Sequence, residues 1–371
     1  IPDDFDEVCA ISRGCASADY YGMGMAAGGR DALIGFISQF RHEGPYIRAA
    51  VERSAQGLVG VEELEGAEFE RLLDATDTDD DRCPTPARGV VGGSNRLGIA
   101  DAFEGEVEAI FHLGACSDTM EYDGLYMMSN NYDYSKTLLH FCQQNKASFI
   151  YASSASVYGA GPVFKELPEF ESPLNVYAYS KFQFDKYVRR MYDDRTAPIV
   201  GLRYFNVYGD REQHKGRMAS VAYHFTHQYM ENGYVNLFEG LDGYENGAQL
   251  RDFVSVEDVV DLNLFFLANP NISGIFNVGT GRCQAFNDMA VASVNQCRRE
   301  NGEEVLDLLA LQQKNIIRYI DFPEKLKDKY QSFTEADISA LREAGYTQKF
   351  LTVEEGVSRY TARLLKKMQQ N

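Results

Sequence analysis

Short apolar runs alternate with longer stretches of helical character from about residue 107 onward. The runs at 107–112 (VEAIFH), 149–153 (FIYAS) and 199–205 (IVGLRYF) are typical of buried parallel strands. Helices are predicted between them, over 126–145 and 175–192. Strands separated by helices of this length imply right-handed crossovers. The pattern therefore predicts an α/β fold built on a doubly wound parallel sheet.

Residues 206–250 show no regular period and are rich in Gly, Tyr and polar residues. They are expected to form substrate-binding segments set between sheet elements. A final amphipathic helix is predicted after Thr352, and its apolar stripe indicates either core packing or an oligomer contact. The stripe consists of Val357, Tyr360, Leu364, Leu365 and Met368.

The first 106 residues lack a clear dinucleotide-binding start. Such a sheet should open with a strand, a Gly-rich turn and a helix, because the pyrophosphate must approach bare backbone at a helix N-terminus. Two clusters are candidates: GMGMAAGG, which contains Gly22 and Gly24, and VVGGSNRLG, which contains Gly92, Gly93 and Gly98. Either cluster could equally be a flexible loop.

The length of 371 residues suggests about two domains at roughly 150 residues each. We expect a dinucleotide-binding domain over 1–205, in which 1–106 is atypical. The remaining 206–371 should form mainly a smaller substrate-binding lobe, with 251–280 returning to the sheet domain.

Charge and composition exclude several classes of protein. Hydrophobic residues make up 44% and charged residues 25%, which is ordinary for a globular protein. A net charge of −19 argues against binding to nucleic acid or an anionic membrane. No apolar stretch is long enough to cross a membrane and no leader is evident, so a cytoplasmic protein is expected. Seven cysteines without a C-x-x-C pair, and six histidines without H-E-x-x-H, predict reduced thiols and no metal site.

One constellation carries chemistry. Tyr177 and Lys181 stand four residues apart in NVYAYSK, so both project from one face of the predicted helix. A phenol is a poor base at neutral pH, but a nearby ammonium favours its phenolate form. The lysine can also bind the ribose of a nicotinamide cofactor. Ser154 ends the FIYASS strand, where it can donate a hydrogen bond to a reacting oxygen. Tyr-x-x-x-Lys alone is common on helix surfaces, whereas its combination with the SSA-x-x-YG strand end is specific.

With these motifs, the sequence resembles the extended short-chain dehydrogenase/reductase superfamily and, more narrowly, the ADP-L-glycero-D-manno-heptose 6-epimerase family. The resemblance runs from about Val107 to the C-terminus. HKGRMAS and YQSFTEADI favour the heptose enzymes over other nucleotide-sugar epimerases. The other motifs are IFHLGACSDT, YMMSNNYDYSK, YASSASVYG, PLNVYAYSK, RYFNVYGDREQ, RDFVSVEDV and GIFNVGTGR.

The resemblance implies an NAD(P)-binding Rossmann domain with a smaller C-terminal α/β substrate lobe. It assigns catalysis to Ser154, Tyr177 and Lys181, with Lys215 as a second acid/base on the opposite side of the sugar carbon; from the residues alone, Lys215 could be a surface lysine. The implied cofactor-binding residues are Leu113, Gly114, Ala115, Cys116, Ser117, Asn130, Lys181 and Val207. The implied substrate-binding residues are Asn206, Arg217, His224, Phe238, Glu239, Gly240, Leu241, Arg251 and Tyr330. Two of these have structural alternatives, since Arg251 could pair with Asp252 and His224 could be a core histidine.

The implied activity is inversion of C6 in ADP-D-glycero-D-manno-heptose, in the synthesis of lipopolysaccharide core precursors by a homo-oligomeric isomerase. Direct deprotonation would require a very weak carbon acid to ionise, whereas transient oxidation with bound NADP, or NAD, avoids that step. Alternatives are another nucleotide-sugar epimerase or dehydratase, and a non-catalytic sugar-nucleotide-binding relative. Ala155 and Ser156 follow Ser154 where the dehydratases carry Asp-Glu, which argues against dehydration.

Overall fold

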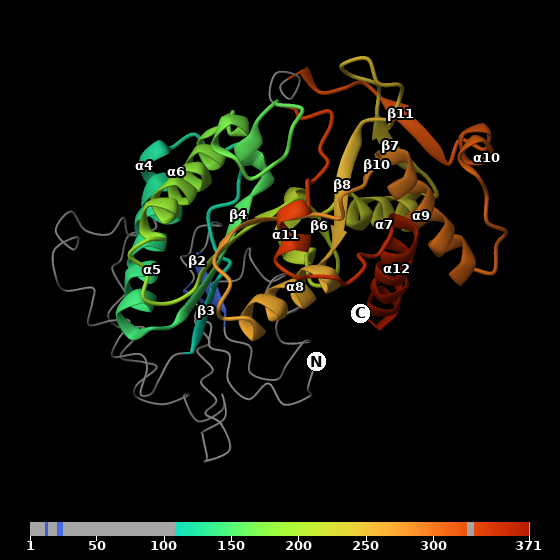
Figure 1. Ribbon diagram of the computed structural model, residues 1–371. Coiled ribbons are helices and arrows are strands. Elements are labelled where there is room, and N and C mark those ends of the chain that lie inside the picture. Colours follow the sequence, from blue (N-terminus) through green and yellow to red (C-terminus); the bar gives the residue numbers. More distant parts are fainter. Residues whose placement is uncertain (1–11, 14–20, 25–107, 325–329, 371) are drawn as a thin grey trace, which may run out of the picture. The chain divides into compact units, whose positions relative to one another are not determined.

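The computed structural model describes residues 12–13, 21–24, 108–324 and 330–370 (Figure 1). Internal contacts divide the chain into two compact units that interleave along the sequence. The first unit contains the described residues up to 153, with 176–202 and 263–275. The second contains 154–175, 203–262 and the described residues from 276 onward. The predicted domain division, at residue 205 with a return over 251–280, stays a prediction.

A six-stranded sheet runs in the order β1-β2-β3-β4-β5-β9. Its strands are β1 Ser12–Arg13, β2 Tyr21–Gly24, β3 Ala109–His112, β4 Ser148–Ser154, β5 Ile199–Tyr204 and β9 Gly274–Val278. β3 and β4 are parallel, with Ala109 opposite Ser148. The predicted strands of residues 107–205 are therefore confirmed, because their uninterrupted apolar runs are buried within the sheet.

One expectation for the N-terminal region is wrong. Gly22 and Gly24 lie inside strand β2, which pairs antiparallel with β3 through Met23 and His112. A strand in this position does not supply the turn that a pyrophosphate needs. The rest of that glycine cluster, and the cluster containing Gly92, Gly93 and Gly98, lie outside the described residues.

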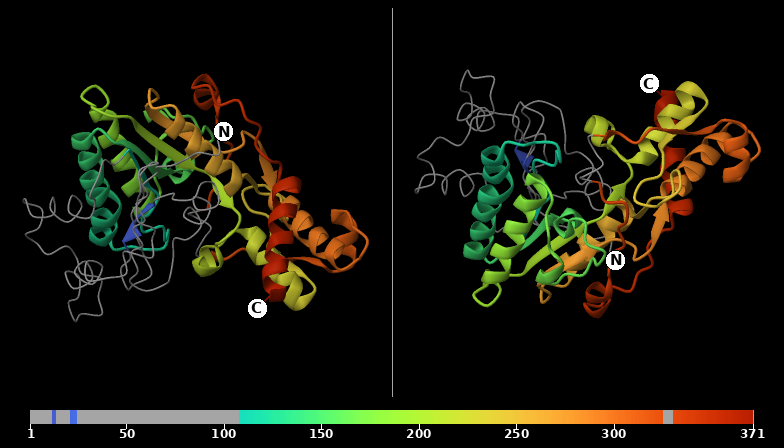
Figure 2. Two further views of the ribbon diagram at one scale, coloured as in Figure 1. Left: turned by 90° about the horizontal axis from the view of Figure 1, so that it is seen from below. Right: turned by 90° about the horizontal axis from the view of Figure 1, so that it is seen from above.

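Helices α5 and α6 cover one face of the sheet in the first unit (Figures 1 and 2). The predicted helix over 126–145 is helical, but a π-helical turn interrupts it; its parts are α4 Gly124–Met128, the π-turn Ser129–Asp133 and α5 Tyr134–Asn145. α6 spans Val176–Met191, as predicted. The shared core consists of Ile110, Leu138, Leu139, Cys142, Ala147, Phe149, Tyr151, Phe184, Val188 and Ile199.

The second unit packs α7, α9 and α12 with two small sheets, β10-β8-β6 and β11-β7. The helices are α7 Val221–Asn232, α9 Phe286–Glu300, α10 Leu308–Gln313, α11 Ser339–Glu343 and α12 Val353–Gln370, and α8 Val256–Ala268 is divided between the two units. The strands are β6 Asn206–Tyr208, β7 Val235–Phe238, β8 Leu250–Ser255, β10 Cys283–Ala285 and β11 Ile317–Ile320. Short 3₁₀ turns are η3 Ala155–Tyr158, η4 Pro168–Phe170 and η5 Gln213–Met218.

Two predictions are decided in this unit. The expectation of an irregular 206–250 segment is wrong for α7, a regular helix that begins at the N-cap Ser220 and ends at Gly233 with φ 75°. The stripe of α12 packs in the core, where Val357, Tyr360, Leu364 and Leu365 are buried and Met368 is partly buried. Core packing, one of the two predicted roles of the stripe, is therefore confirmed.

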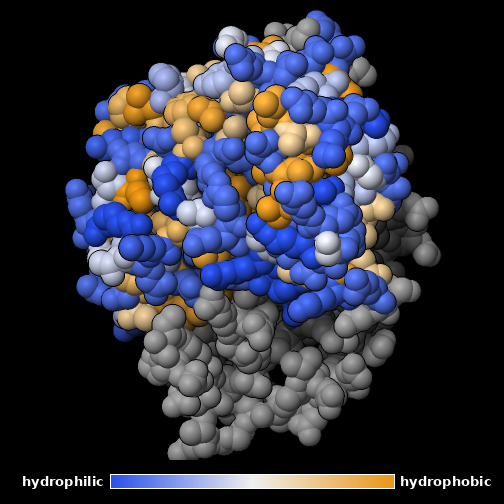
Figure 3. All heavy atoms as spheres, turned by 90° about the vertical axis from the view of Figure 1, so that its right-hand side faces the viewer, coloured by the Kyte–Doolittle hydropathy of each residue, from blue (hydrophilic) through white to orange (hydrophobic). Residues whose placement is uncertain are grey.

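The face seen from the α10 and α12 side is mainly hydrophilic, with hydrophobic residues in smaller separate groups (Figure 3). Within the described part of the chain, no helix is both long and apolar enough to cross a membrane.

Candidate active site

Helix α6 presents Tyr177 and Lys181 one turn apart, as the spacing predicts. Lys181 is 4% exposed, and its Nζ donates a hydrogen bond to the carbonyl oxygen of Ala152 at 2.7 Å. Burial lowers the pKa of Lys181 to about 8, although the nearby Asp185 carboxylate acts in the opposite direction. The ammonium form therefore predominates at neutral pH, on the same helix face as the partly exposed Tyr177.

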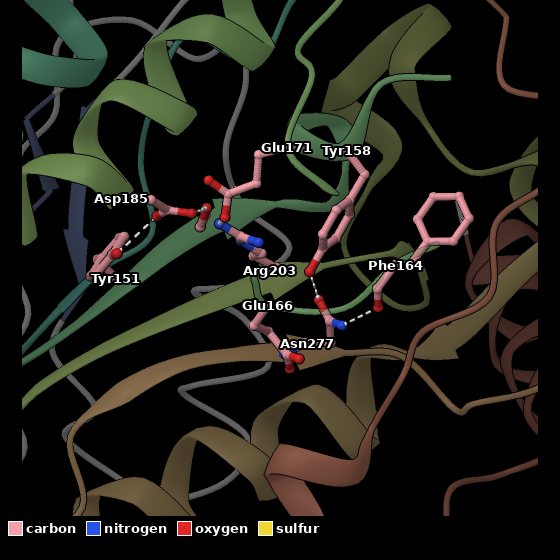
Figure 4. A network of polar contacts seen from close by, with 9 residues as sticks. Tyr151, Tyr158, Phe164, Glu166, Glu171, Asp185, Arg203 and Asn277 are labelled. Carbon is pink, nitrogen blue, oxygen red and sulfur yellow. Dashed lines mark hydrogen bonds and ion pairs between the residues drawn. The ribbon is translucent and has the colours of Figure 1, made fainter. Parts of the chain in front are cut away.

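A buried carboxylate fixes α6 against β4. Asp185 is fully buried and accepts hydrogen bonds from Tyr151 Oη at 2.8 Å and Ser153 Oγ at 2.9 Å (Figure 4). Tyr151 and Ser153 are two residues apart, so they lie on one face of the strand. These bonds fix α6 to β4 at Asp185, one helical turn after Lys181. Lys181 is itself bonded to Ala152, which lies between Tyr151 and Ser153 on the strand.

Ser154 is the last residue of β4 and the N-cap of η3. Its Oγ accepts hydrogen bonds from Ser156 N at 3.2 Å and from Ser156 Oγ at 2.9 Å. Because it accepts in both contacts, its own hydroxyl hydrogen is available for donation. Ser154 can therefore donate to a reacting oxygen, as its position predicts. It belongs to the second unit, whereas Tyr177 and Lys181 belong to the first.

The turn after β3 is held by Asn131, a residue that the sequence reasoning missed. Its Oδ1 accepts from Cys116 N and its Nδ2 donates to Cys116 O, both at 2.8 Å. Nδ2 also contacts Ser180 Oγ at 3.0 Å, and Ser180 Oγ donates to Tyr177 O at 2.7 Å. Asn131 therefore links the predicted cofactor turn to the start of the helix that carries Tyr177. The Asn-Asn pair in YMMSNNYDYSK could have indicated it, but the family resemblance predicts a binding role for Asn130 alone.

The neighbouring Asn130 differs from Asn131 in the hydrogen bonding of its side-chain amide nitrogen. It is 5% exposed, and none of the described residues accepts a hydrogen bond from its buried Nδ2. A buried donor without a partner is costly and indicates a binding role. In the turn Leu113–Ser117, Gly114 and Cys116 are buried and the other three residues are partly exposed. The unpartnered Nδ2 of Asn130 is thus a donor suited to an acceptor on a nicotinamide dinucleotide, and the cofactor contacts of the turn stay predictions.

In the second unit, Lys215 and Arg217 lie together in the 3₁₀ turn η5. Lys215 is partly exposed and Arg217 exposed. Gly216 separates them with φ 51° and ψ −128°, a conformation that favours glycine. Asn206 is exposed and Val207 partly exposed on the nearby strand β6. Their contacts with substrate or cofactor stay predictions.

Arg251 meets aromatic rings. Its guanidinium lies 4.7 Å from the centre of the Tyr330 ring and 5.9 Å from that of Phe286, and the residue is 6% exposed. Burial lowers its pKa. The alternative of a pair with Asp252 is wrong, because that carboxylate accepts hydrogen bonds from Thr280 N, Thr280 Oγ1, Gly281 N and Ala336 N instead. Among the described residues, no carboxylate forms an ion pair with Arg251, so its charge can serve an anionic ligand.

The predicted substrate segment Phe238–Leu241 is bound to the YENGAQ segment that follows it. Gly240 N donates to Asn246 Oδ1 at 2.9 Å, and Gln249 Nε2 donates to Glu239 O at 2.8 Å. A Cβ atom at Gly240 would lie 2.0 Å from Tyr244 O, so glycine is required by this close approach. The YENGAQ segment, residues 244–249, thus holds the backbone of Phe238–Leu241, and the substrate contacts of that segment stay predictions.

His224 lies on α7, partly exposed, with its ring against Tyr223 at 5.7 Å between centroids. The alternative of a core histidine is therefore wrong. Its contact with substrate stays a prediction.

A buried polar network lies in the second unit. Arg203 forms an ion pair with Glu171, and both side chains are fully buried. The guanidinium lies 4.9 Å from the centre of the Tyr158 ring, and Tyr158 Oη donates to Asn277 Oδ1 at 2.7 Å (Figure 4). Asn277 N in turn donates to Glu166 Oε1 at 2.7 Å, and burial raises the pKa of that carboxyl group. Sequence reasoning missed this network, because its five members are far apart in the sequence and two of them, Glu166 and Glu171, lie outside the motifs.

Comparison with known proteins identifies the family of this chain. Residues 90–279 match the NAD dependent epimerase/dehydratase family. The chain is 58% identical over 322 residues to an ADP-L-glycero-D-manno-heptose-6-epimerase from Thiobacillus denitrificans, covering 86% of this chain and 94% of the relative. The chain belongs to the NAD dependent epimerase/dehydratase family, among its ADP-L-glycero-D-manno-heptose-6-epimerases.

Solved structures of this family share its fold. The Helicobacter pylori ADP-L-glycero-D-manno-heptose-6-epimerase is 31% identical with a TM-score of 0.60, covering 72% of this chain and 76% of that one. A UDP-N-acetylglucosamine 4-epimerase from Methanobrevibacter ruminantium is 24% identical with a TM-score of 0.58, covering 71% and 78%. The predicted α/β Rossmann fold is confirmed.

The family likeness extends further toward the N-terminus than the motifs indicated. The part of the chain after residue 106 is shorter than the 322-residue alignment with the Thiobacillus relative. The alignment therefore includes residues of the first 106, and the family match itself begins at residue 90. The expectation that the likeness begins at about Val107 is wrong.

Proposed function

We propose that this protein inverts C6 of the heptose in ADP-D-glycero-D-manno-heptose to give the L-glycero epimer. The proposal rests above all on the 58% identity to an ADP-L-glycero-D-manno-heptose-6-epimerase across 94% of that relative. The arrangement of Tyr177 and Lys181 on α6 supports it. Membership of the same family leads us to propose NADP, or NAD, as the cofactor.

The cofactor would be held by the turn Leu113–Ser117, Asn130, Lys181 and Val207. A bound nicotinamide dinucleotide supplies hydride acceptance and return, which lets the carbinol carbon pass through a ketone. The unpartnered Nδ2 of Asn130 would then gain an acceptor. In this family, the cofactor is regenerated in each turnover.

The chain's own residues move the proton. The Lys181 ammonium favours the phenolate form of Tyr177, which then accepts the proton of the sugar hydroxyl. The hydroxyl hydrogen of Ser154 stabilises the developing oxygen charge. Lys215 serves the epimer whose hydroxyl points to the opposite face, because one base cannot reach both faces of the carbon.

Buried Arg251 is suited to the diphosphate of the substrate. A guanidinium can bind two oxygens at once, and Tyr330 and Phe286 hold this one in place. Exposed Arg217 would add a second cation. We assign the remaining substrate contacts to Asn206, His224 and Phe238–Leu241.

The proposal further places the enzyme in the cytoplasm as a homo-oligomer that supplies lipopolysaccharide core precursors. Size-exclusion chromatography with light scattering measures its assembly. A single-chain mass near 41.7 kDa would contradict the oligomer.

The decisive experiment follows C6 epimerisation of ADP-D-glycero-D-manno-heptose by proton NMR with NADP or NAD supplied. Nucleotide released from denatured protein is identified by chromatography. Tyr177→Phe should lower turnover by about 100-fold or more, since it removes the acid/base group. The matched control is Tyr179→Phe on the same helix, whose 46% exposed ring has no assigned role. An unchanged substrate with both cofactors would refute the proposal and favour a non-catalytic relative.

A further inference from the structure

The two ends of the segment that carries Lys215 are joined by hydrogen bonds to a buried carboxylate, that of Glu212. Glu212 is 2% exposed. Its Oε2 accepts a hydrogen bond from Ser220 N at 2.7 Å, and its Oε1 accepts one from Ser220 Oγ at 2.6 Å. Both carboxylate oxygens are thus bonded to Ser220, eight positions further along the chain, and the Glu212 side chain also forms a hydrogen bond with Tyr360 on α12. We call residues 212–220 the Lys215 loop.

Within the Lys215 loop, the backbone turns twice. Lys215 N donates to Glu212 O at 3.0 Å, and Ala219 N donates to Gly216 O at 3.1 Å. Gly216 has a positive φ between these turns and breaks the helical run. Two short turns joined at such a residue have little rigidity of their own. The side-chain bonds of Glu212 therefore determine how firmly the loop is closed.

Ser220 connects the closed loop to the core of the second unit. Its Oγ also accepts a hydrogen bond from Tyr223 N at 3.3 Å, as the N-cap of α7. Ala222, Phe225 and Tyr229 bury one face of that helix in the core. The far end of the loop is therefore attached to a helix that is packed in the core.

The near end of the loop is fixed as well. Asp210 accepts hydrogen bonds from Arg363 Nε at 2.5 Å and Lys367 Nζ at 2.9 Å, both on α12. Arg363 also bonds Glu257 at 2.6 Å, at the start of α8. With both ends anchored, release of Glu212 would free the turns that bear Lys215 without unfolding the surrounding helices.

We propose that Glu212 is a positioning residue, which keeps the Lys215 loop closed on Ser220 and so sets the place of the Lys215 amine during turnover. The inference rests on the proposed function, in which Lys215 is an acid/base group. Glu212 does not act on substrate itself, because both of its oxygens are occupied by Ser220. Misplacement of a reacting group by about 1 Å can cost a hundredfold in rate.

Limited proteolysis tests the closure without any substrate. Trypsin cleaves after Arg211, Lys215 and Arg217, which all lie in or beside the loop. Glu212→Gln places an amide donor against a Ser220 donor, so cleavage at these bonds should accelerate about tenfold or more. Ser220→Ala keeps the backbone bond and should give a smaller acceleration. The matched control is Asp307→Asn, which makes the same acid-to-amide change at the N-cap of α10 in the same unit. Equal cleavage of Glu212→Gln, Asp307→Asn and the parent protein would overturn the proposal.

Kinetics test the positioning role. Glu212→Gln should lower kcat and kcat/KM equally, by about tenfold to a hundredfold, because the Lys215 amine that it misplaces acts on the reacting group only in the transition state. In a Lys215→Met background, the same change should have no further effect. Additive losses, or rapid cleavage with an unchanged kcat, would overturn the role. A parent protein that does not epimerise the substrate refutes the proposed function instead, while proteolysis still decides whether Glu212 closes the loop.

Discussion

Two adjacent asparagines of the first unit allow a test of which buried polar residues stabilise the fold and which bind a ligand. Asn130 and Asn131 both lie in the π-turn and both are buried. Asn131 makes two hydrogen bonds to the Cys116 backbone and contacts Ser180. Asn130 has a buried Nδ2 that no described residue accepts from. Leucine has the same number and branching of side-chain heavy atoms as asparagine, so Asn130→Leu and Asn131→Leu remove the polar atoms and keep the branched shape.

The expected magnitudes follow from the hydrogen bonds. A buried group that loses its partner costs about 1–3 kcal/mol, and Asn131→Leu removes the partner of both Cys116 N and Cys116 O. The free energy of unfolding should therefore fall by about 2–5 kcal/mol. Asn130→Leu removes a donor that has no accepting partner in the free chain, so its unfolding free energy should stay within about 1 kcal/mol of the parent value. Its affinity for the dinucleotide should fall about five- to tenfold, the equivalent of one hydrogen bond.

The assay uses protein from which nucleotide has been removed. Urea unfolding followed by circular dichroism gives the stability of each variant, and calorimetric titration with NADP and with NAD gives the affinities. Equal destabilisation by the two variants would contradict the assignment of separate roles. An unchanged dinucleotide affinity of Asn130→Leu would show that its Nδ2 does not face the cofactor.

The remaining predictions concern two buried cations. Because burial lowers the pKa of Lys181 to about 8, below its ordinary 10.5, the folded protein releases this proton before the unfolded chain does. The buried charge therefore destabilises the folded protein fully below pH 8, and this destabilisation disappears toward pH 10.5. Between these pH values the free energy of unfolding of the parent should rise by up to about 3 kcal/mol relative to that of Lys181→Met. Parallel curves of unfolding free energy against pH for the two proteins would contradict this. Arg203→Met should destabilise by about 3–5 kcal/mol, because it leaves Glu171 charged and buried without its cation. Adding Glu171→Leu should recover most of that loss, and a further loss in urea unfolding would refute the reasoning.

The sequence predicted the elements whose hydrophobic pattern is local. Strands β3, β4 and β5 were found because a buried parallel strand is an uninterrupted apolar run with clear ends. Helix α7 was missed, although Ser220 and Gly233 stand at its two ends as a cap pair. Its buried face includes Thr226 and Tyr229, whose polar atoms hid the helical period.

The π-turn could not be predicted, because no residue pattern distinguishes it from the helices on either side. The pairing of Tyr177 with Lys181 could be predicted from the sequence, because their spacing places both residues on one helix face. The roles of Asn131 and Glu212 could not be predicted, since each depends on a bond to a backbone amide as well as on bonds to side chains. A sequence shows which side chains are present, but the position of a backbone amide depends on how the chain folds around it.

This difference separates two kinds of buried polar residue in the candidate site. Asn131 and Glu212 have both polar ends bonded within the chain, and each closes a backbone segment next to a residue proposed to bind or react. Asn130 keeps a buried donor without an acceptor among the described residues, and Arg251 keeps a buried charge without a carboxylate among them. Such unmet demands reduce the stability of the free chain and are relieved only by a ligand of matching polarity. The satisfied residues therefore support the backbone within each unit, whereas we expect the unsatisfied ones to bind ligands: a hydrogen-bond acceptor at Asn130 in the first unit and an anion at Arg251 in the second, as a dinucleotide and a nucleotide-diphosphate sugar would provide.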